Sequence, residues 1–333
     1  MMKAVVLDEY GGAVGLRVAD LPTPQPTKGE VLIEVAATPI NPSDLAFIAG
    51  NYPPKPPVPA YPGLEGSGTV VRAGPGIVGR YLSGKRVAFV AGGGGGGAWA
   101  EYVKVPSRLA LPLDGEVTLE AGAMSVVNPM TALAFLEIAH SGNHRSVLNT
   151  AAAGALGQMV DRLLSSAGIR VINIVRRPAH VDEVARHGAD LVLDSSSPDF
   201  DAELRVVCKQ EGARLAFDAV AGELTGRLLA AMPGEATVIL YGGLSEQPVS
   251  AEIGDLIFKG KTVTGFWLTR WLPQKNIVQS MRLWRRVQRL IGSDLSSEIR
   301  SRYPLESVVE AVTDYENDMS SGKVMLTPAG GTD

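Results

Sequence analysis

Residues 146–177 decide the fold, and they read SVLNTAAAGALGQMVDRLLSSAGIRVINIVRR. The stretch begins with a short apolar strand pattern over 146–149 and continues into a helical pattern over 155–167. A second apolar run, 170–175, is rich in β-branched residues and predicts another strand. Strand, glycine-containing turn, helix and strand in this order are typical of a βαβ unit in a parallel sheet.

The turn between the first strand and the helix keeps the spacing of a dinucleotide-binding fingerprint. Residues 152–157 read AAGALG, so alanine stands in the first glycine place. Gly154 would let the backbone approach a pyrophosphate, and Gly157 would let helix and strand pack closely. Ala155 then begins the helix whose N-terminus faces the phosphates. Because the motif lies between a strand and a helix, it predicts a dinucleotide site.

The end of the second strand indicates which dinucleotide binds. NAD sites usually place an acidic residue there, which binds the ribose 2′-hydroxyl. This chain has Arg176 and Arg177 instead, and the next acid is Asp182. Because a guanidinium suits a 2′-phosphate, the sequence predicts NADP(H) as the cofactor. The alternative is a pair of solvated arginines at the start of a helix.

The rest of the chain predicts an α/β protein of two domains. A β-rich domain is expected over 1–122 and 295–333, and a doubly wound parallel sheet over 123–294. In the first domain, strands are predicted at 30–37, 67–71, 86–91 and 324–327, the last returning from the C-terminal tail. In the second, further strands are predicted at 191–193, 215–219, 236–240 and 262–266, and helices at 178–187, 200–211, 224–232 and 275–291.

Composition excludes several classes of protein. The chain has 333 residues, 45% of them hydrophobic, and a formal net charge of −4, which predicts globular domains and gives no basic field for nucleic acid. Cys208 is the only cysteine, so no internal disulfide is expected. The sequence shows neither 18 consecutive uncharged apolar residues nor a secretory signal pattern. We therefore expect a cytoplasmic protein without a membrane span.

Aromatic residues gather where two predicted strands end. Tyr241–Gly243 follows the strand 236–240, and Trp267 follows the strand 262–266. In open α/β sheets the carboxyl ends of the strands hold the ligand. Glycine lets a flat ring approach the backbone, and aromatic side chains wall an apolar channel. The alternative is a buried strand pair with ordinary core aromatics.

Together with the glycine turn, three strings in the first domain resemble the medium-chain dehydrogenase/reductase superfamily. They are Ile40–Asp44 (INPSD), Gly50–Tyr52 (GNY) and Pro62–Gly66 (PGLEG). The resemblance implies a GroES-like catalytic domain and a Rossmann domain, with the active site in the cleft between them. Zinc-bearing members carry cysteine and histidine where this chain has Ser43 and Leu64. No metal is therefore expected.

Within the zinc-free branch, the sequence is most similar to the 2-enoyl thioester reductases of mitochondrial-type fatty-acid synthesis. The resemblance implies reduction of a trans-2-enoyl thioester of CoA or acyl carrier protein (ACP). The six glycines of Gly92–Gly97, predicted to form a flexible loop, and the string Trp99–Tyr102 are more similar to quinone oxidoreductases. The strings that carry the first resemblance are Ile40–Asp44, Gly50–Tyr52, Tyr241–Gly243, Gln247–Val249, Leu256–Lys259 and Gly265–Leu268, followed by Trp271.

Tyr52 is the expected proton donor. In the reductase family the matching tyrosine lies at the active site and is implicated in substrate protonation. A phenol is protonated at neutral pH, so it can deliver a proton to the α-carbon after hydride reaches the β-carbon. The resemblance assigns Asn41 and Asp44 to the catalytic group, where we expect them to orient the loop carrying Tyr52. The alternative for Tyr52 is a packing residue in a proline-rich loop.

Other residues are expected at the cofactor and the substrate. Asn128 and Thr131 match a superfamily stretch near the nicotinamide; alternatively, they cap a helix that begins near Pro129. The remaining residues expected at the cofactor are Tyr241, Gly242, Phe266 and Trp267, and those expected along an acyl channel are Trp267 and Trp271.

The sequence also suggests partners and competing functions. A basic helical face is predicted to dock an acidic ACP or CoA phosphates, or else to be solvated surface. We expect a homodimer formed through the edge strand 262–266, because superfamily members commonly pair these edges. Competing functions are an NADPH:quinone or small-enone reductase, and an NADPH-binding sensor or structural protein with little turnover. The arginines of the basic face are Arg282, Arg285, Arg286 and Arg289.

Overall fold

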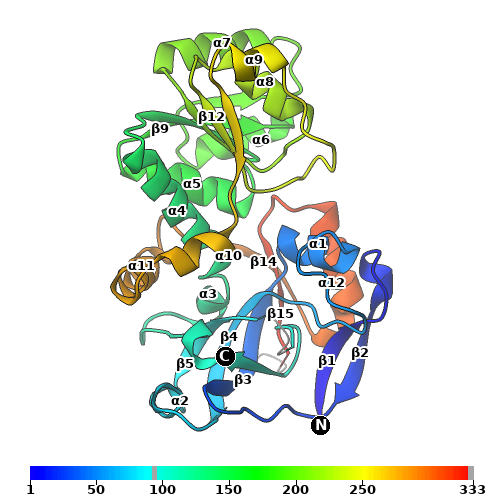
Figure 1. Cartoon of the computed structure of the whole chain (residues 1–333). Coiled ribbons are helices and arrows are strands. Elements are labelled where there is room, and N and C mark those ends of the chain that lie inside the picture. The colour runs from blue at the N-terminus through cyan, green and yellow to red at the C-terminus, as the bar shows by residue number, and fades with distance from the viewer. Residues whose placement is uncertain (92–95, 329–333) are drawn as a thin grey trace. The chain divides into compact units, whose positions relative to one another are not determined.

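The computed structural model describes residues 1–91 and 96–328, which form two compact units (Figure 1). Residues 92–95 of the predicted glycine loop lie outside the described residues. In this division the end of the long C-terminal helix of the second unit, from Arg286 on, groups with the first unit. The first unit is Met1–Val127, Arg286–Gly292 and Ser296–Asp333, and the second is Asn128–Arg285 and Ser293–Leu295.

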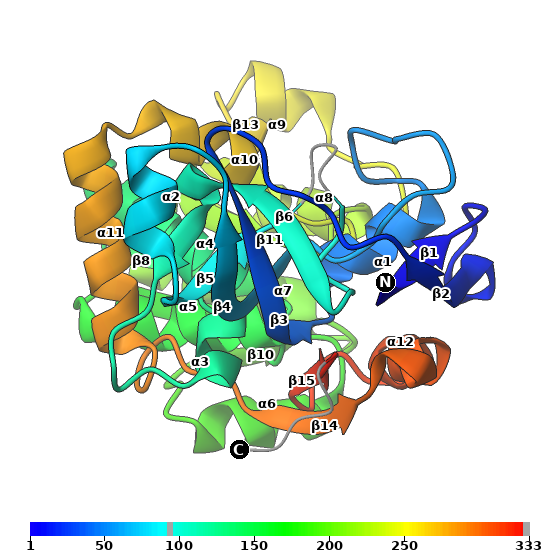
Figure 2. The ribbon, with the colours of Figure 1, turned by 90° about the horizontal axis from the view of Figure 1, so that it is seen from below.

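The first unit is β-rich. Its strands are β1 (Met2–Leu7), β2 (Leu16–Leu21), β3 (Glu30–Pro39), β4 (Glu65–Ala73), β5 (Arg86–Val90), β6 (Tyr102–Pro106), β7 (Ala110–Pro112), β14 (Ile299–Tyr303) and β15 (Lys323–Leu326). The main sheet has the order β14-β15-β3-β4-β5-β7, and β6 also pairs with β3 (Figure 2). Strands β1 and β2 form a separate antiparallel pair. The predicted return of the C-terminal tail to this sheet is confirmed by β15, which pairs with β3.

Helices cover part of this unit. They are α1 (Pro42–Ala49), α2 (Ile77–Leu82), α3 (Leu119–Ala123) and α12 (Val308–Asn317). Helix α12 buries Val308, Ala311, Val312 and Tyr315, whose spacing places them on one helical face. These side chains share a core cluster with Ile48 of α1 and with apolar residues of β1 and β15.

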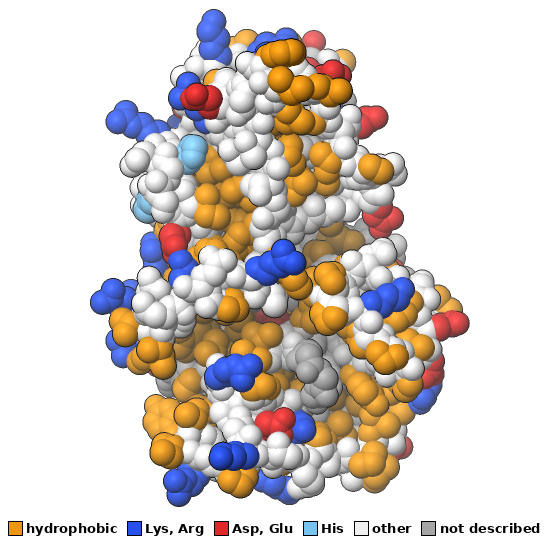
Figure 3. Space-filling model, viewed as in Figure 1, with side chains coloured by type: hydrophobic (Ala, Val, Ile, Leu, Met, Phe, Trp, Pro, Cys, Tyr) orange, Lys and Arg blue, Asp and Glu red, His pale blue; other side chains and the backbone are white. Residues whose placement is uncertain are grey.

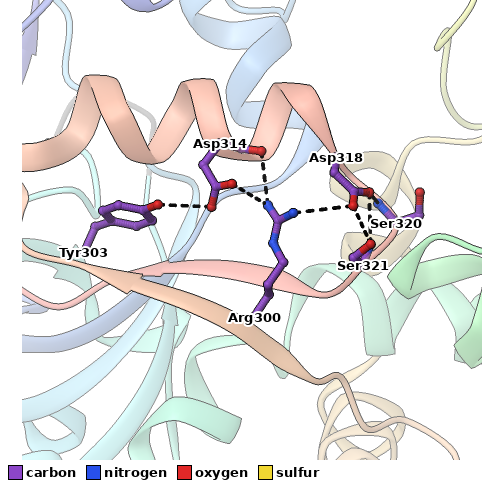
Figure 4. Close-up of polar contacts among 6 residues, drawn as sticks. All are labelled: Arg300, Tyr303, Asp314, Asp318, Ser320 and Ser321. Atoms are coloured by element: carbon purple, nitrogen blue, oxygen red, sulfur yellow. Dashed lines mark hydrogen bonds and ion pairs between the residues drawn. The ribbon is translucent and has the colours of Figure 1, made fainter.

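A polar cluster links β14 to α12 and the turn that follows it (Figure 4). Arg300 of β14 lies 3.1 Å from Asp314 and 3.5 Å from Asp318, and the Tyr303 hydroxyl donates to Asp314 at 3.2 Å. The Asp318 carboxylate also accepts hydrogen bonds from Ser320 and Ser321. Strand β14 reads IRSRY; it pairs with β15, Ile299 and Tyr303 pack against apolar clusters, and Arg300 adds the ion pairs.

The second unit is a doubly wound parallel sheet, as predicted. Its strands are β8 (Ser146–Thr150), β9 (Arg170–Val175), β10 (Val192–Asp194), β11 (Leu215–Asp218), β12 (Thr237–Leu240) and β13 (Thr262–Gly265). The spatial order is β10-β9-β8-β11-β12-β13 and every pairing is parallel. Numbered from β8, this is the order 3-2-1-4-5-6, with the topological switch point between β8 and β11.

The remaining helices belong to this unit, except that α11 continues into residues grouped with the first unit. They are α4 (Val127–Ser141), α5 (Ala155–Ser166), α6 (Pro178–Arg186), α7 (Phe200–Glu211), α8 (Glu223–Ala231), α9 (Ile253–Ile257), α10 (Leu268–Trp271) and α11 (Ile277–Leu290). A core cluster joins Phe200, Leu204 and Cys208 of α7 to Leu228 of α8 and to the strands. Among the described residues, no helix is long and apolar enough to cross a membrane.

Candidate active site

Helix α1 presents Tyr52 at its C-terminal end. The helix begins after Asn41, whose backbone N–H donates to the Asp44 carboxylate at 2.8 Å, and proline occupies its first position. It ends at Gly50, which has the left-handed conformation (φ 83°). Because residues with a Cβ rarely adopt this conformation, the turn favours glycine. Tyr52 follows two residues later and is half-buried.

A buried polar network fixes the start of α1. The Asn41 side-chain amide donates to Glu65 at 2.9 Å, and its carbonyl oxygen accepts from the ammonium of Lys323. The second carboxylate oxygen of Asp44 accepts from the backbone N–H of Leu64 at 3.0 Å. Glu65 also accepts from two successive backbone N–H groups at the start of α4, at 3.2 and 2.8 Å. The four network side chains are almost completely buried, so the structure places Asn41 and Asp44 in the interior at the start of α1 rather than at an open surface.

Burial dominates the electrostatics of this network. It raises the pKa of Asp44 to about 7, against the hydrogen bonds from Asn41 and the attraction of Lys323. Burial likewise raises the pKa of Glu65, although Lys323 and the backbone donors oppose it. The same desolvation lowers the pKa of Lys323, against the attraction of both carboxylates. Two carboxyl groups thus share one buried cation.

The residues at the superfamily zinc position do not fit zinc. Ser43 and Leu64 stand where a thiolate and an imidazole would be needed, and Cys208 lies in the other unit. The Ser43 hydroxyl oxygen is buried and has no hydrogen-bond partner among the described residues. Across residues 1–91 and 96–328, no group of three or more His, Cys, Asp and Glu residues is arranged to hold a metal ion.

The predicted fingerprint forms the turn between β8 and α5. Gly154 precedes the helix and Ala155 is its first residue. A Cβ at Gly157 would lie 2.4 Å from the carbonyl oxygen of Ala151, so the helix packs on the turn only with glycine there. Asn149 of β8 donates its side-chain amide to the Gly157 carbonyl at 3.0 Å, which ties the helix to the strand. The turn therefore has the strand-turn-helix context that the predicted pyrophosphate site requires, and the site itself stays a prediction.

Arg176 and Arg177 lie directly after β9, where a ribose is bound in Rossmann folds. Both are exposed, and Arg177 is the residue that precedes α6. Within the described part of the chain, neither guanidinium has an ion pair or a side-chain hydrogen bond with the protein. This arrangement suits a 2′-phosphate, although it is also compatible with solvated arginines.

Asp218 organises the switch point, a role that the sequence analysis missed. Its carboxylate accepts from the hydroxyls of Thr150 and Thr225, each at 2.8 Å, and from the backbone N–H groups of Val220 and Ala221. The Thr150 oxygen in turn accepts from the next backbone N–H after Asp218. The ends of β8 and β11 are therefore locked together. The sequence signal was an acid that closes the apolar run LAFD.

An aromatic cluster lies beneath the ends of β11, β12 and β13. Phe135 of α4 stacks on Phe217, with ring centroids 4.1 Å apart. It also contacts Tyr241 at 4.9 Å and Phe266 at 5.2 Å, and Phe266 lies 6.3 Å from Trp271. Burial raises the pKa of the Tyr241 phenol well above its ordinary value. The cluster joins three predicted residues to Phe135 and Phe217, which were not predicted.

Three further residues predicted at the site are Gly242, Trp267 and Trp271. Gly242 contacts a neighbouring loop, and each tryptophan lies near a cationic side chain. A Cβ at Gly242 would lie 2.7 Å from the Ala219 carbonyl oxygen, so glycine lets two adjacent loops approach each other. Arg270 lies 5.5 Å from the Trp267 ring, and Lys275 lies 4.4 Å from the Trp271 ring. Both tryptophans are half-buried. Their places at a cofactor and along an acyl channel stay predictions.

Asn128 and Thr131 are buried in the first turns of α4. The alternative that Asn128 caps a helix beginning near Pro129 is wrong, because α4 begins at Val127 and includes Asn128. The backbone N–H groups of Val126 and Val127 instead donate to the Glu65 carboxylate, which satisfies donors at the start of this helix. Sequence reasoning missed this contact because Glu65 lies 61 and 62 positions away.

Two family models match the chain, one in each unit. The alcohol dehydrogenase GroES-like domain matches residues 27–115, and the zinc-binding dehydrogenase domain matches residues 155–286. The mitochondrial enoyl-[acyl-carrier-protein] reductase of Arabidopsis thaliana is 30% identical over 332 residues, covering 98% of this chain and 86% of that protein. The human enzyme of the same name is 29% identical over 306 residues, covering 90% and 81%.

Solved structures give a second group of relatives. A Mesorhizobium loti protein assigned as an NADPH:quinone reductase has 34% identity and a TM-score of 0.91, with 98% of each chain covered. A mycobacterial protein solved in complex with NADPH has 28% identity and a TM-score of 0.86, covering 98% of this chain and 100% of that one. The chain therefore belongs to the medium-chain dehydrogenase/reductase superfamily and is an oxidoreductase of that superfamily.

Proposed function

We propose that this protein reduces α,β-unsaturated carbonyl compounds with NADPH, and that its substrate is a trans-2-enoyl thioester. The observation that carries the proposal is the presentation of Tyr52 by α1, in a chain 30% identical to an enoyl-[acyl-carrier-protein] reductase over almost its whole length. The helix start is held by buried hydrogen bonds and its end by Gly50. In this proposal the Tyr52 hydroxyl is carried on a fixed support.

The second unit supplies the cofactor site in this proposal. When bound, NADPH would supply the hydride that the substrate β-carbon accepts. The α5 N-terminus at Gly154 would hold the pyrophosphate, and Arg176 with Arg177 would hold the 2′-phosphate through charge-assisted hydrogen bonds. The mycobacterial relative solved with NADPH supports this choice of cofactor. The Asp218 network keeps the strand ends at the switch point rigid while the dinucleotide lies across them.

The first unit supplies the proton. When hydride reaches the β-carbon, negative charge develops on the carbonyl oxygen and the α-carbon becomes basic. The Tyr52 hydroxyl donates its proton to that carbon, directly or through one water molecule. The resulting phenolate then recovers a proton from solvent. Asn41 and Asp44 act indirectly in this scheme, by holding the helix that carries Tyr52.

The thioester carrier is proposed to meet the basic face of α11. Arg282, Arg285, Arg286 and Arg289 are all exposed along this helix. Their spacing puts them on one side, where an acidic ACP or the phosphates of CoA would find complementary charge.

A second copy of the chain is the other proposed partner. Strand β13 pairs only with β12 among the described strands, so its outer backbone edge is open. The residues just before it are apolar and exposed: Ile253 is 69%, Ile257 66% and Phe258 86% exposed. Figure 3 shows hydrophobic side chains at the surface over α9. Pairing of two β13 edges would cover both features.

An NADPH:quinone reductase is the second candidate function. It is favoured by the Mesorhizobium loti structure, whose 34% identity and TM-score of 0.91 extend over 98% of both chains. An aromatic-lined site such as that near Phe266 and Trp271 suits a flat quinone as well as an acyl chain.

Steady-state NADPH oxidation distinguishes the two functions. We would compare kcat/KM for a medium-chain trans-2-enoyl-CoA with that for phenanthrenequinone, using the same enzyme preparation. The enoyl reductase proposal requires a clear advantage for the thioester. A clear advantage for the quinone would replace it with the second candidate. NADPH binding without turnover of either compound would instead indicate a sensor or structural protein.

A further inference from the structure

One lysine is buried in the first unit, far in sequence from the helix it contacts. Lys323 is the first residue of β15, and only 1% of it is exposed. The rest of the strand, Val324–Leu326, is apolar and fully buried. A charged side chain in such a strand costs free energy unless it is paired, so its partners indicate its role.

The Lys323 ammonium orients the side chain of Asn41. It donates a hydrogen bond to the Asn41 carbonyl oxygen, while the Asn41 amide nitrogen donates to Glu65 at 2.9 Å. The two contacts use opposite ends of one amide group, so they fix which way it faces. The backbone N–H of Asn41 is then held for Asp44, the contact that starts α1.

We infer that Lys323 is a positioning residue for Tyr52, acting through Asn41 and the N-terminal end of α1. The chain of contacts runs from Lys323 to Asn41, from Asn41 to Asp44, and along a helix of eight residues to Gly50 and Tyr52. The inference rests on the proposed function, because it assumes that Tyr52 delivers the proton.

Charge explains why a lysine is needed here. Without the ammonium, the carboxyl groups of Asp44 and Glu65 would share a buried site with no cation, and the Asn41 carbonyl would lose its donor. Removing one member of a buried charged group is costly and shifts the remaining members. The helix start would therefore relax, and the Tyr52 hydroxyl would leave the position from which it donates.

The chain offers a matched control. Lys261 in the second unit is also buried, with 1% of its side chain exposed, and it forms an ion pair with Asp255 at 2.9 Å. The substitution Lys261→Met removes a comparable buried cation without touching α1. The double variant Lys323→Met/Glu65→Gln removes one positive and one negative charge, so the net charge of the network is kept. It replaces Lys323→Met in the test if the single variant fails to fold.

The test is a double-mutant cycle on kcat with enoyl-CoA. Lys323→Met is expected to lower kcat about tenfold or more in the wild-type background, and less than about twofold when Tyr52 is already Phe. Lys261→Met is expected to leave kcat within about twofold, and the Kd for NADPH is expected to change little in all variants. Equal losses in both backgrounds, an unchanged kcat in folded Lys323→Met, or a fully active Tyr52→Phe would each overturn the inference.

Hydrogen exchange supplies a readout that does not depend on turnover. Backbone amides of residues 41–52 are expected to exchange faster in Lys323→Met than in the wild type, and unchanged in Lys261→Met. If the wild type reduces only quinones, the proposed function fails, and this measurement still decides whether Lys323 holds the helix. Unchanged exchange over 41–52 in Lys323→Met would overturn the inference in that case as well.

Discussion

The proposed protonation of the substrate depends on one group, the hydroxyl of Tyr52. Replacing Tyr52 by Phe removes the hydroxyl and leaves the ring, so packing is retained while the proton donor is lost. We expect kcat with enoyl-CoA to fall about tenfold to a hundredfold, below the usual range for a general acid because water can substitute in part. The Kd for NADPH, measured by fluorescence titration, should not change.

Tyr61→Phe is the matched control, because Tyr61 lies in the same proline-rich region and is 41% exposed. It should retain the wild-type kcat. A Tyr52→Phe enzyme with full activity at saturating enoyl-CoA would remove the phenol from the mechanism.

Arg176 and Arg177 determine the proposed cofactor preference. Replacing both by Ala removes the charged donors for a 2′-phosphate and leaves the pyrophosphate site at Gly154 intact. Because charge-assisted hydrogen bonds contribute about 1.5–3 kcal/mol each, the ratio of kcat/KM for NADPH to that for NADH should fall by about tenfold or more. Arg186→Ala, at the far end of α6, should keep the wild-type ratio. An unchanged ratio in the double variant would mean that the two arginines are solvated surface.

At the residue scale, motifs defined by neighbouring residues could be predicted from the sequence, whereas contacts between residues far apart in the chain could not. The glycine turn and the two arginines are interpretable because each motif takes its meaning from adjacent strands and helices. Lys323 and Asn41 are 282 positions apart, and nothing in the sequence around either predicts that they meet. Phe135 was hidden for a different reason, since one phenylalanine in an apolar helix looks like any other core residue.

At the scale of the element, the start of α1 should make stability depend on pH. The folded protein holds the Asp44 proton up to about pH 7, whereas an unperturbed carboxyl releases it near 3.8. The folded state therefore binds more protons between these values. As the pH rises through this window the free energy of unfolding should fall, by at most about 1.4 kcal/mol per pH unit.

Denaturant unfolding between pH 4 and pH 8 measures this slope. Asp44→Asn should flatten it, although the variant also loses an acceptor for a backbone N–H. The raised pKa of Glu65 adds a slope of the same sign that remains in the variant. Asp20→Asn in β2, an exposed site, is the control and should keep the wild-type slope. An equal slope in wild type and Asp44→Asn would show that Asp44 is ionised in the folded protein throughout this range.

Periodic elements were predictable, and elements made by tertiary contact were not. Strand β9 and helix α7 coincide with their predicted bounds, because apolar periodicity specifies each of them. Strand β14 was missed because only two of its five residues, Ile299 and Tyr303, are apolar, and Arg300 reaches Asp314 and Asp318 only in the folded chain. Helix α4 begins earlier than expected because Glu65 accepts hydrogen bonds from its first N–H groups.

At the scale of the whole molecule, the two units carry separable parts of the proposed reaction. In the proposal, cofactor selection depends on Arg176 and Arg177, and proton delivery depends on Tyr52 with its buried support. The two sets belong to different units, so variants in one should alter cofactor preference and variants in the other the rate of protonation. Because of this separation, an unchanged Kd for NADPH shows that a variant of the first unit has left the second unit intact.

The proposed dimer is the last property at this scale. Phe258 is 86% exposed and lies four residues before β13, whose outer edge is open among the described strands. The substitution Phe258→Glu places a carboxylate at this position. If two β13 edges pair, that carboxylate would have to lose its water on dimerisation. We expect wild type to sediment as a dimer and Phe258→Glu to dissociate at concentrations at least about tenfold higher, since a buried unpaired charge costs a few kcal/mol.

Val206→Glu is the matched substitution, because Val206 on α7 is also an exposed apolar residue, at 54% exposure, but belongs to a different helix from the α9 surface. It should sediment as the wild type does. A monomeric wild type across the micromolar range would show that the β13 edge is not paired with a second copy. A dimer that tolerates Phe258→Glu would place the contact on another surface, and the exposed apolar side chains of α9 would then need a different explanation.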